Sequence, residues 1–172
     1  MSILPGLLGA TVFIGLLYVL FQLSRMYWDL PFVETRDNTV GDMVSLLDIR
    51  KGERAADLGA GDGRLVIALA KAGAVVEGYE TNIFLVWRAR RKIREAGYAD
   101  RAHIHWKSLW GTDLSSFTVI TVFGIEPIME RLEKKLRQEL PPGARVASNY
   151  FPFPEWPKTA EQNDALLYCQ ND

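Results

Sequence analysis

Residues 55–64 read AADLGAGDGR and decide the fold class of this 172-residue chain. The segment begins as an apolar strand, passes the acidic Asp57 and enters a glycine-rich turn that opens a helix. A strand, a glycine-rich turn and a helix in this order bring backbone amides close to a nucleoside-bearing cofactor. The segment therefore predicts a cofactor-binding α/β domain, and the spacing of its glycines indicates which cofactor.

The glycines of the turn are Gly59, Gly61 and Gly63, in the pattern GxGxG. A dinucleotide fingerprint needs its third glycine one residue later, where this chain has Arg64. No Lys-Ser or Lys-Thr pair follows, so the turn is not a phosphate-binding P-loop either. A GxGxG turn suits a cofactor without a pyrophosphate, whose small zwitterionic end and ribose lie against the backbone. S-adenosylmethionine is such a molecule.

An acidic residue, Glu80, ends the next expected strand, roughly 20 residues after the turn. A carboxylate at this position accepts hydrogen bonds from ribose hydroxyls. The alternative is that Glu80 caps the helix that begins near Asn82. The combination of strand, turn, helix, strand and terminal carboxylate favours nucleoside binding.

Strand-like and helix-like stretches alternate through the chain after its first residues. We expect strands at residues 54–58, 75–80, 103–107, 117–123, 145–150 and 165–170. We expect helices at residues 63–71, 83–96 and 128–140, and an earlier one that begins at Asp37, Asn38 or Thr39. This alternation predicts a mostly parallel sheet with helices on both faces and ligands at the carboxyl ends of the strands.

The composition argues against several functional classes. A net charge of -1 at pH 7 provides no field that would attract nucleic acid, so we expect no nucleic-acid partner. The single cysteine, Cys169, allows no internal disulfide and fits a reducing compartment. No cluster of potential ligands has metal-site spacing, so we expect no metal.

Residues 3–23, ILPGLLGATVFIGLLYVLFQL, contain no charged residue. As a helix this segment would span about 30 Å, the thickness of the hydrocarbon core of a bilayer. A signal peptide is disfavoured because no Lys or Arg precedes the segment, and a buried core helix is disfavoured by its glycines. We expect a membrane anchor at residues 1–28 and a globular domain at residues 29–172. The basic residues after the span, from Arg25 onward, place that domain in the cytoplasm.

The basic stretch RARRKIR, residues 88–94, has two open interpretations. It contacts anionic lipid headgroups, or it is simply a solvated helix face.

Several longer stretches follow one another after residue 30. They are PFVETRDNTVGDMVSLL, AADLGAGDGRLVIALAKAGA, VEGYETNIFLVWRAR, FGIEPIMERLEKKLRQELPPGARVAS and FPFPEW. In this order they resemble a family of membrane-anchored protein-lysine methyltransferases, whose animal members act on the c subunit of ATP synthase and on the adenine nucleotide translocase. The loop before the first strand is similar, more weakly, to Dot1-type histone lysine methyltransferases. The resemblance implies a Rossmann-like class I fold with S-adenosylmethionine as cofactor.

The resemblance also implies a set of cofactor-binding residues. They are Glu34, Thr35, Asp57, Gly59, Gly61, Gly63, Glu80 and Ser108. Glu80 would hold the ribose hydroxyls, while Glu34 and Thr35 would close over the amino-acid end. Ser108 stands where related enzymes often carry an aspartate that accepts from the adenine amino group, and a serine hydroxyl accepts more weakly. A sheet of this class has seven strands, one more than we expect here, so the last hairpin would be incomplete.

The residues expected to act on the acceptor lie in the second half of the chain. A lysine must lose its proton before it attacks a methyl group, and a desolvating aromatic channel lowers its pKa. The candidates for that channel are Tyr150, Phe151, Phe153 and Trp156. The alternative is that these aromatic rings cover the open end of the core. Glu126 would steer the ammonium or assist its deprotonation, or it belongs only to a helix N-terminus.

These observations lead to one expected function and two alternatives. We expect a single-pass, cytoplasm-facing protein-lysine N-methyltransferase that uses S-adenosylmethionine and acts on a protein substrate embedded in the membrane. The first alternative is a methyltransferase for a membrane-soluble small molecule, such as a quinone or a lipid headgroup. The second is a non-catalytic scaffold that uses the fold to bind a partner.

Overall fold

The computed structural model describes residues 12–21 and 37–171, which belong to two compact units, Met1–Pro31 and Phe32–Asp172. In the first unit, residues 12–21 form a helix whose large apolar side chains are exposed. Within the described ranges, no helix is both long enough and apolar enough to cross a bilayer. Residues 1–11 and 22–28 of the expected anchor lie outside the described residues.

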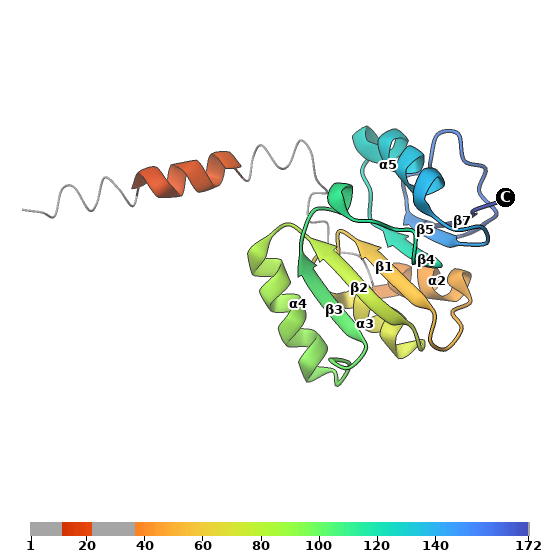
Figure 1. The fold of residues 1–172 in the computed structure, drawn as a ribbon, viewed down its shortest axis with the longest axis horizontal. Helices are drawn as coiled ribbons and strands as arrows, with labels where there is room; N and C mark the ends of the chain where they lie inside the picture. The colour runs from red at the N-terminus through yellow and green to blue at the C-terminus, as the bar shows by residue number, and fades with distance from the viewer. Residues whose placement is uncertain (1–11, 22–36, 172) are drawn as a thin grey trace, which may run out of the picture. The chain divides into compact units, whose positions relative to one another are not determined.

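The second unit is built on a seven-stranded sheet with the order β3-β2-β1-β4-β5-β7-β6 (Figure 1). The strands are β1 (Arg54–Leu58), β2 (Val75–Glu80), β3 (Ala102–Trp106), β4 (Val119–Val122), β5 (Arg145–Asn149), β6 (Ala160–Gln162) and β7 (Ala165–Cys169). The strands β1 to β5 pair in parallel, whereas β7 is antiparallel to β5 and to β6. The predicted α/β class with a mostly parallel sheet is confirmed.

Helix α2 (Asp37–Leu47) precedes β1. The elements between later strands are α3 (Arg64–Lys71), α4 (Ile83–Glu95), the short 3-10 turn η1 (Leu109–Gly111) and α5 (Glu126–Glu139). Buried side chains of α2, α3 and α4 form one hydrophobic cluster with the sheet, and Figure 1 shows α2 and α3 behind the strands. Every residue of β4 is buried, as expected for a central parallel strand that is covered on both faces.

The expectation of an incomplete hairpin is wrong, because β6 completes the seven strands. This strand has only three residues, of which Glu161 and Gln162 are exposed. It lies at the edge of the sheet and pairs with β7 alone, so it needs neither apolar alternation nor length. Its turn to β7 passes through Asn163, whose φ of 51° is one that asparagine tolerates in tight hairpins.

The other predicted elements of this unit lie within two residues of their expected ends. The largest difference at a helix start is in α5, which was expected at residue 128 and begins at Glu126. Pro127 does not interrupt this helix, because proline fits the first helical turn, where its missing N–H would have no partner.

Candidate functional site

The register of the parallel strands brings their carboxyl ends to one level. Leu58 of β1 lies opposite Tyr79 of β2 and Val122 of β4, and Val122 lies opposite Ser148 of β5. The residues that directly follow these positions therefore meet along one edge of the sheet. The glycine turn, Glu80 and the end of β5 all lie at this edge.

The glycine turn is fixed by backbone hydrogen bonds. The amides of Gly59 and Ala60 both donate to the carbonyl of Tyr79, at 2.9 and 3.0 Å. The φ angles of Gly59, Gly61 and Gly63 are 90°, 52° and 83°, in the region that residues with a Cβ rarely adopt. A Cβ on Gly63 would also lie 2.9 Å from the Cβ of Ala89 in α4. The turn therefore needs glycine both for its backbone path and for the close approach of α4.

Asp57 lies next to the end of β1 and is 3% exposed. Its Oδ1 accepts a hydrogen bond from the Thr121 hydroxyl of β4 at 2.8 Å. Burial raises the pKa of Asp57 to about 7, the Thr121 hydrogen bond opposes this rise, and the nearby charge of Glu80 adds to it. At neutral pH this carboxyl group is therefore poised between its neutral and its charged form.

Glu80 ties the glycine turn to the start of α4. One carboxylate oxygen accepts from the Gly61 amide at 3.0 Å, and the other accepts from the amides of Thr81 and Asn82 at 2.8 and 2.7 Å. The helix cap itself is Asn82, whose side chain accepts from the Phe84 amide at 3.0 Å. A carboxylate has about four acceptor sites, so one site remains on the oxygen that faces the turn.

Asp62 lies in the glycine turn and forms ion pairs that link this turn to α4, a role that the sequence patterns did not indicate. Its side chain is 6% exposed and lies 2.5 Å from the Lys92 ammonium, 3.2 Å from the Arg64 guanidinium and 3.7 Å from that of Arg88. Burial raises the pKa of this carboxyl group, but the hydrogen bond and charge of Lys92, with the two arginines, outweigh burial and lower it. The signal in the sequence was the second aspartate of AADLGAGDGR, followed by a basic stretch.

The remaining predicted cofactor residues have different positions. Ser108 follows β3, is half-buried and caps η1, where its hydroxyl accepts from the Trp110 amide at 3.4 Å. Glu34 and Thr35 lie outside the described residues. In the part of the chain that is described, no group of His, Cys, Asp and Glu is placed to hold a metal ion.

The four aromatic candidates for an acceptor channel separate into two pairs. Phe153 and Trp156 are buried and pack against Tyr168 of β7, with ring centroids 4.8 and 5.7 Å from its ring. Their backbone and indole N–H groups donate to the Tyr168 hydroxyl and to the carbonyl of Cys169. The structure therefore places this pair in the core, as in the alternative interpretation, and not on an open channel wall.

The other pair lies at the carboxyl edge of the sheet. Tyr150 directly follows β5, is 65% exposed and meets the Phe151 ring edge-on at 5.0 Å. The Phe151 amide donates to the carbonyl of Asn149 at 2.7 Å, and Tyr150 between them has a φ of 61°. This is the geometry of a tight, strained turn, a feature that is frequent at ligand sites.

Glu126 is exposed and is the first residue of α5, which begins beyond the end of β4. The N-terminus of this helix has no side-chain cap, so Glu126 does not act as one. Its carboxylate is favourable near the positive end of the helix dipole.

Comparison with known proteins finds lysine methyltransferases among the relatives of this chain. A family model described as the ANTKMT methyltransferase domain matches residues 57–160. The lysine N-methyltransferase of the ATP synthase c-subunit from Rattus norvegicus is 42% identical over 127 residues, which cover 74% of this chain and 58% of that protein. The adenine nucleotide translocase lysine N-methyltransferase of Mus musculus is 37% identical, covering 90% of this chain and 68% of that protein.

A protein-lysine N-methyltransferase of Saccharolobus islandicus is 34% identical over 73% of this chain and 80% of its own length. This chain spans little more than half the length of the ATP synthase c-subunit methyltransferases of Rattus norvegicus, Mus musculus and Homo sapiens.

Solved structures share the fold. An RNA methyltransferase from Salinibacter ruber, in complex with S-adenosyl-L-homocysteine, superposes with a TM-score of 0.76 at 30% identity and covers 81% of this chain and 95% of its own. The C-terminal domain of a precorrin-6Y C5,15-methyltransferase from Rhodobacter capsulatus gives a TM-score of 0.62 at 20% identity, over 72% of this chain and 67% of its own. The second likeness concerns the fold alone.

Proposed function

This chain belongs to the family of the ANTKMT methyltransferase domain, and from that premise we propose that it is an S-adenosylmethionine-dependent protein-lysine N-methyltransferase. The observation that carries the proposal is its similarity to lysine N-methyltransferases with different protein substrates, over 90% of the chain in one case. The matched family region, residues 57–160, includes the glycine turn and Glu80.

The residues at the carboxyl edge fit the proposed cofactor. Bound S-adenosylmethionine would supply a methyl group on a sulfonium, which passes to an amine by in-line displacement. The three glycines of the turn have no side chains to block a close approach of the methionine and ribose part. Glu80 keeps one acceptor site for a ribose hydroxyl, and the ionised form of Asp57 would face the positive charge of the ligand.

The chain's own contribution to such a reaction is alignment and exclusion of water. Tyr150 and Phe151 lie beyond β5, on the same edge as the glycine turn, and their rings offer faces that attract an ammonium group. Glu126 begins α5 beyond β4, where a carboxylate would attract a lysine ammonium before it loses its proton. We assign these three residues to the acceptor side of the site.

Membrane association is the second part of the proposal. The uncharged segment at residues 3–23 would anchor the chain as a single span, with residues 29–172 as the methyltransferase domain on the cytoplasmic side. An anchor in the same bilayer raises the effective concentration of membrane-protein substrates. We therefore propose that the acceptor lysine belongs to a membrane-associated protein.

The test uses the purified full chain, methyl-labelled S-adenosylmethionine and membranes of its host. Protein, lipid and RNA are separated after the reaction, and the labelled protein is hydrolysed to amino acids. We expect the label in methylated lysine. Label in lipid or small molecules, with none in protein, would show that the proposed protein acceptor is wrong. A folded protein that binds no cofactor in calorimetry would instead support the alternative of a non-catalytic scaffold.

A second acceptor, RNA, is suggested by the similarity to the Salinibacter ruber enzyme. The net charge of -1 argues against it, because RNA-binding surfaces are usually strongly basic. The RNA fraction of the same experiment distinguishes the two acceptors.

A further inference from the structure

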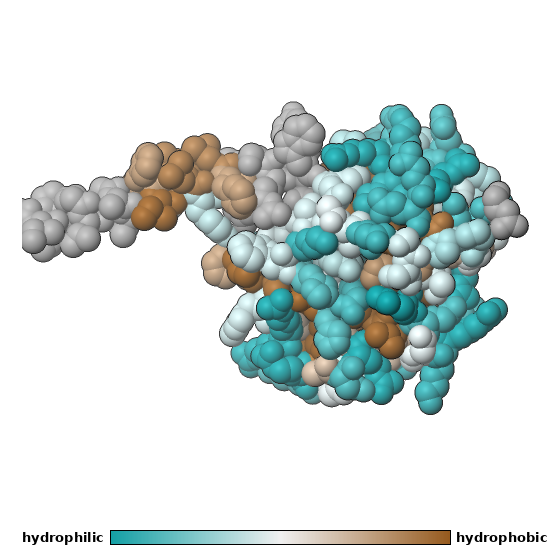
Figure 2. Space-filling view, viewed as in Figure 1, coloured by the Kyte–Doolittle hydropathy of each residue, from teal (hydrophilic) through white to brown (hydrophobic). Residues whose placement is uncertain are grey.

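Four large side chains are exposed near the start of α4. Ile83, Phe84, Trp87 and Trp106 are 40%, 67%, 64% and 59% exposed. We call these four residues the α4 patch. In the space-filling view, brown hydrophobic atoms stand among teal charged ones over the end of α4 that is nearer the carboxyl ends of the strands (Figure 2).

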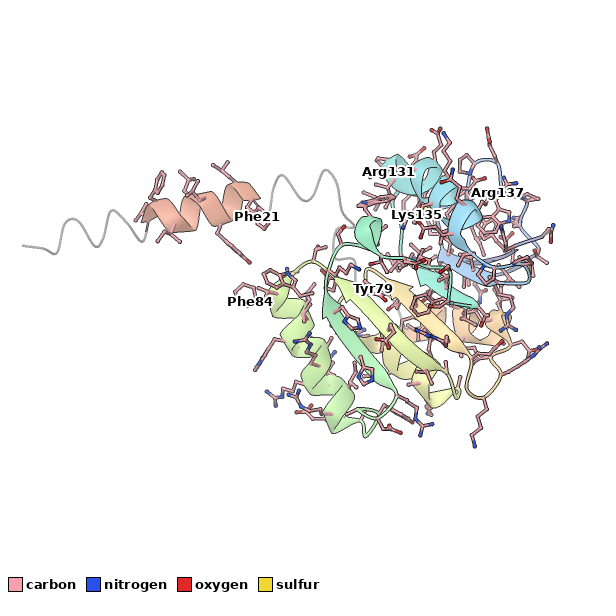
Figure 3. All side chains as sticks on the ribbon, in the orientation of Figure 1. Phe21, Tyr79, Phe84, Arg131, Lys135 and Arg137 are labelled. Carbon is pink, nitrogen blue, oxygen red and sulfur yellow. The ribbon has the colours of Figure 1, made fainter. Side chains whose placement is uncertain are left out.

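The helical part of the patch points away from the sheet. The inner face of α4 is formed by Val86, Ala89 and Ile93, which are buried, and the exposed Phe84 and Trp87 lie away from that face. Phe84 extends from the start of the helix, away from the strands (Figure 3). The Trp106 indole N–H donates to the carbonyl of Thr81 at 2.8 Å, which fixes an exposed aromatic ring beside the start of α4.

Positive charge follows the patch along the same helix. The sequence of α4, IFLVWRARRKIRE, has five basic residues and one acidic residue. The side chains of Arg88 and Arg91 are 53% and 60% exposed, although Arg88 lies near Asp62 and Arg91 pairs with Glu95. Exposed aromatic rings next to arginines are the combination that fits a bilayer interface with anionic headgroups.

We propose that the α4 patch docks the methyltransferase domain onto an anionic lipid surface. This inference rests on the proposed membrane anchoring and adds the orientation of the domain. Only 13 residues, 24–36, separate the apolar segment from α2, and they extend at most about 45 Å. A domain held within that reach docks through a weak patch because its local concentration at the bilayer is high.

A lipid surface fits this patch better than a protein partner does. A stable protein interface buries about 800 Å² on each side and involves roughly 20 to 30 residues. Four side chains make a much smaller surface, whereas tryptophan and arginine insert individually at the headgroup level. Docking would also face the candidate site toward the bilayer, since α4 begins three residues after Glu80.

The experiment measures the depth of a nitroxide label in vesicles that contain the full chain. The only cysteine is replaced by Cys169→Ser, and a label is attached at Phe84→Cys or, as a control on α5, at Lys134→Cys, whose side chain is 65% exposed. Collision with oxygen reports lipid, and collision with a water-soluble nickel chelate reports water. Vesicles contain phosphatidylcholine alone or with phosphatidylserine.

In phosphatidylserine vesicles, we expect the label at position 84 to collide severalfold more with oxygen than with nickel, and the label at position 134 to do the reverse. Arg91→Glu with Arg94→Glu, at two exposed positions of α4 that do not contact Asp62, should return the label at position 84 to water. The charge-matched control, Lys134→Glu with Lys158→Glu, should leave it in lipid.

Several outcomes would overturn the inference. In the first, the label at position 84 collides with the nickel chelate as often as the control label at position 134 does. In the second, the label enters lipid only when a membrane protein is added. In the third, the chain fails to float with vesicles. Cofactor titration of the same proteins tests the proposed enzyme separately. A wet label with intact cofactor binding overturns the docking alone, and a lipid-embedded label without cofactor binding overturns the enzyme alone.

Discussion

Asp57 shows how strongly a single site residue depends on its surroundings. Its carboxyl group is 3% exposed, and burial raises its pKa to about 7, against 3.8 for an ordinary aspartate. The folded chain therefore holds a proton between about pH 4 and pH 7 that the unfolded chain has already lost. Stability falls as pH rises through this window and stays lower above it.

The replacement Asp57→Asn removes this titration and keeps an oxygen that accepts from Thr121. We expect the variant to gain free energy of unfolding relative to the parent by roughly 2–3 kcal/mol between pH 5 and pH 8. Its cofactor affinity should fall, because the neutral amide has no charge to offer. Urea unfolding at both pH values and calorimetry check this, and an equal difference at the two pH values would contradict the role of burial.

Glu80 combines two tasks, because its carboxylate holds three backbone amides as well as the proposed ribose position. Glu80→Gln keeps an oxygen for Thr81 and Asn82 and loses the bond to Gly61. Glu80→Ala loses all three bonds, at about 1 kcal/mol for each. We expect both variants to bind the cofactor weakly in calorimetry, with alanine the less stable in urea. Equal stability of the two would show that the amides find other partners.

At the scale of elements, Asp62 connects the turn before α3 to α4 through Lys92 and Arg88, and it also pairs with Arg64 at the start of α3. The pKa of this carboxyl group is lowered although burial opposes the shift, so its stabilising effect is present above about pH 4 and is lost as pH falls further. We call Asp62 and its ion pairs the Asp62 clamp. The Asp62 clamp holds α4 against the glycine turn, where a Cβ on Gly63 would lie too close to Ala89.

We expect Asp62→Asn to lower the free energy of unfolding at pH 7 by about 1–3 kcal/mol, because a buried, neutral amide is a weaker acceptor for its partly exposed cationic partners than the carboxylate is. The loss should shrink toward pH 3. The matched control is Asp100→Asn, which breaks an exposed ion pair with Arg101 and should have no measurable effect. A similar loss of free energy of unfolding in both variants would mean that the ion pairs of Asp62 stabilise the protein no more than an exposed ion pair does.

At the scale of the whole molecule, the proposed anchor determines where the enzyme works. We expect removal of residues 3–23 to release the chain from vesicles in flotation assays while cofactor binding is kept. Methylation of a membrane-embedded substrate should then fall about 100-fold, as expected when tethering is lost. Activity on the same substrate in detergent should change little. A released chain that methylates membranes at the parent's rate would show that tethering is not needed.

Local patterns in the sequence predict the order of the elements and the residues proposed to hold the cofactor. Strand periodicity, the GxGxG turn and the acidic end of β2 are local patterns, so they are visible without a fold. They placed Asp57, the three glycines and Glu80 at one edge of the sheet, where the structure has them.

The distant residues that contact these groups are known only from the tertiary structure. Thr121 reaches Asp57 through the pairing of β1 with β4, and Lys92 reaches Asp62 through the packing of α4. Packing against β7 places Phe153 and Trp156 in the core beside Tyr168, whereas Tyr150 is exposed. The polar β6 is a strand because β7 offers it an edge to pair with. Pairing and burial depend on contacts between segments far apart in the chain, and no local pattern of residues encodes them.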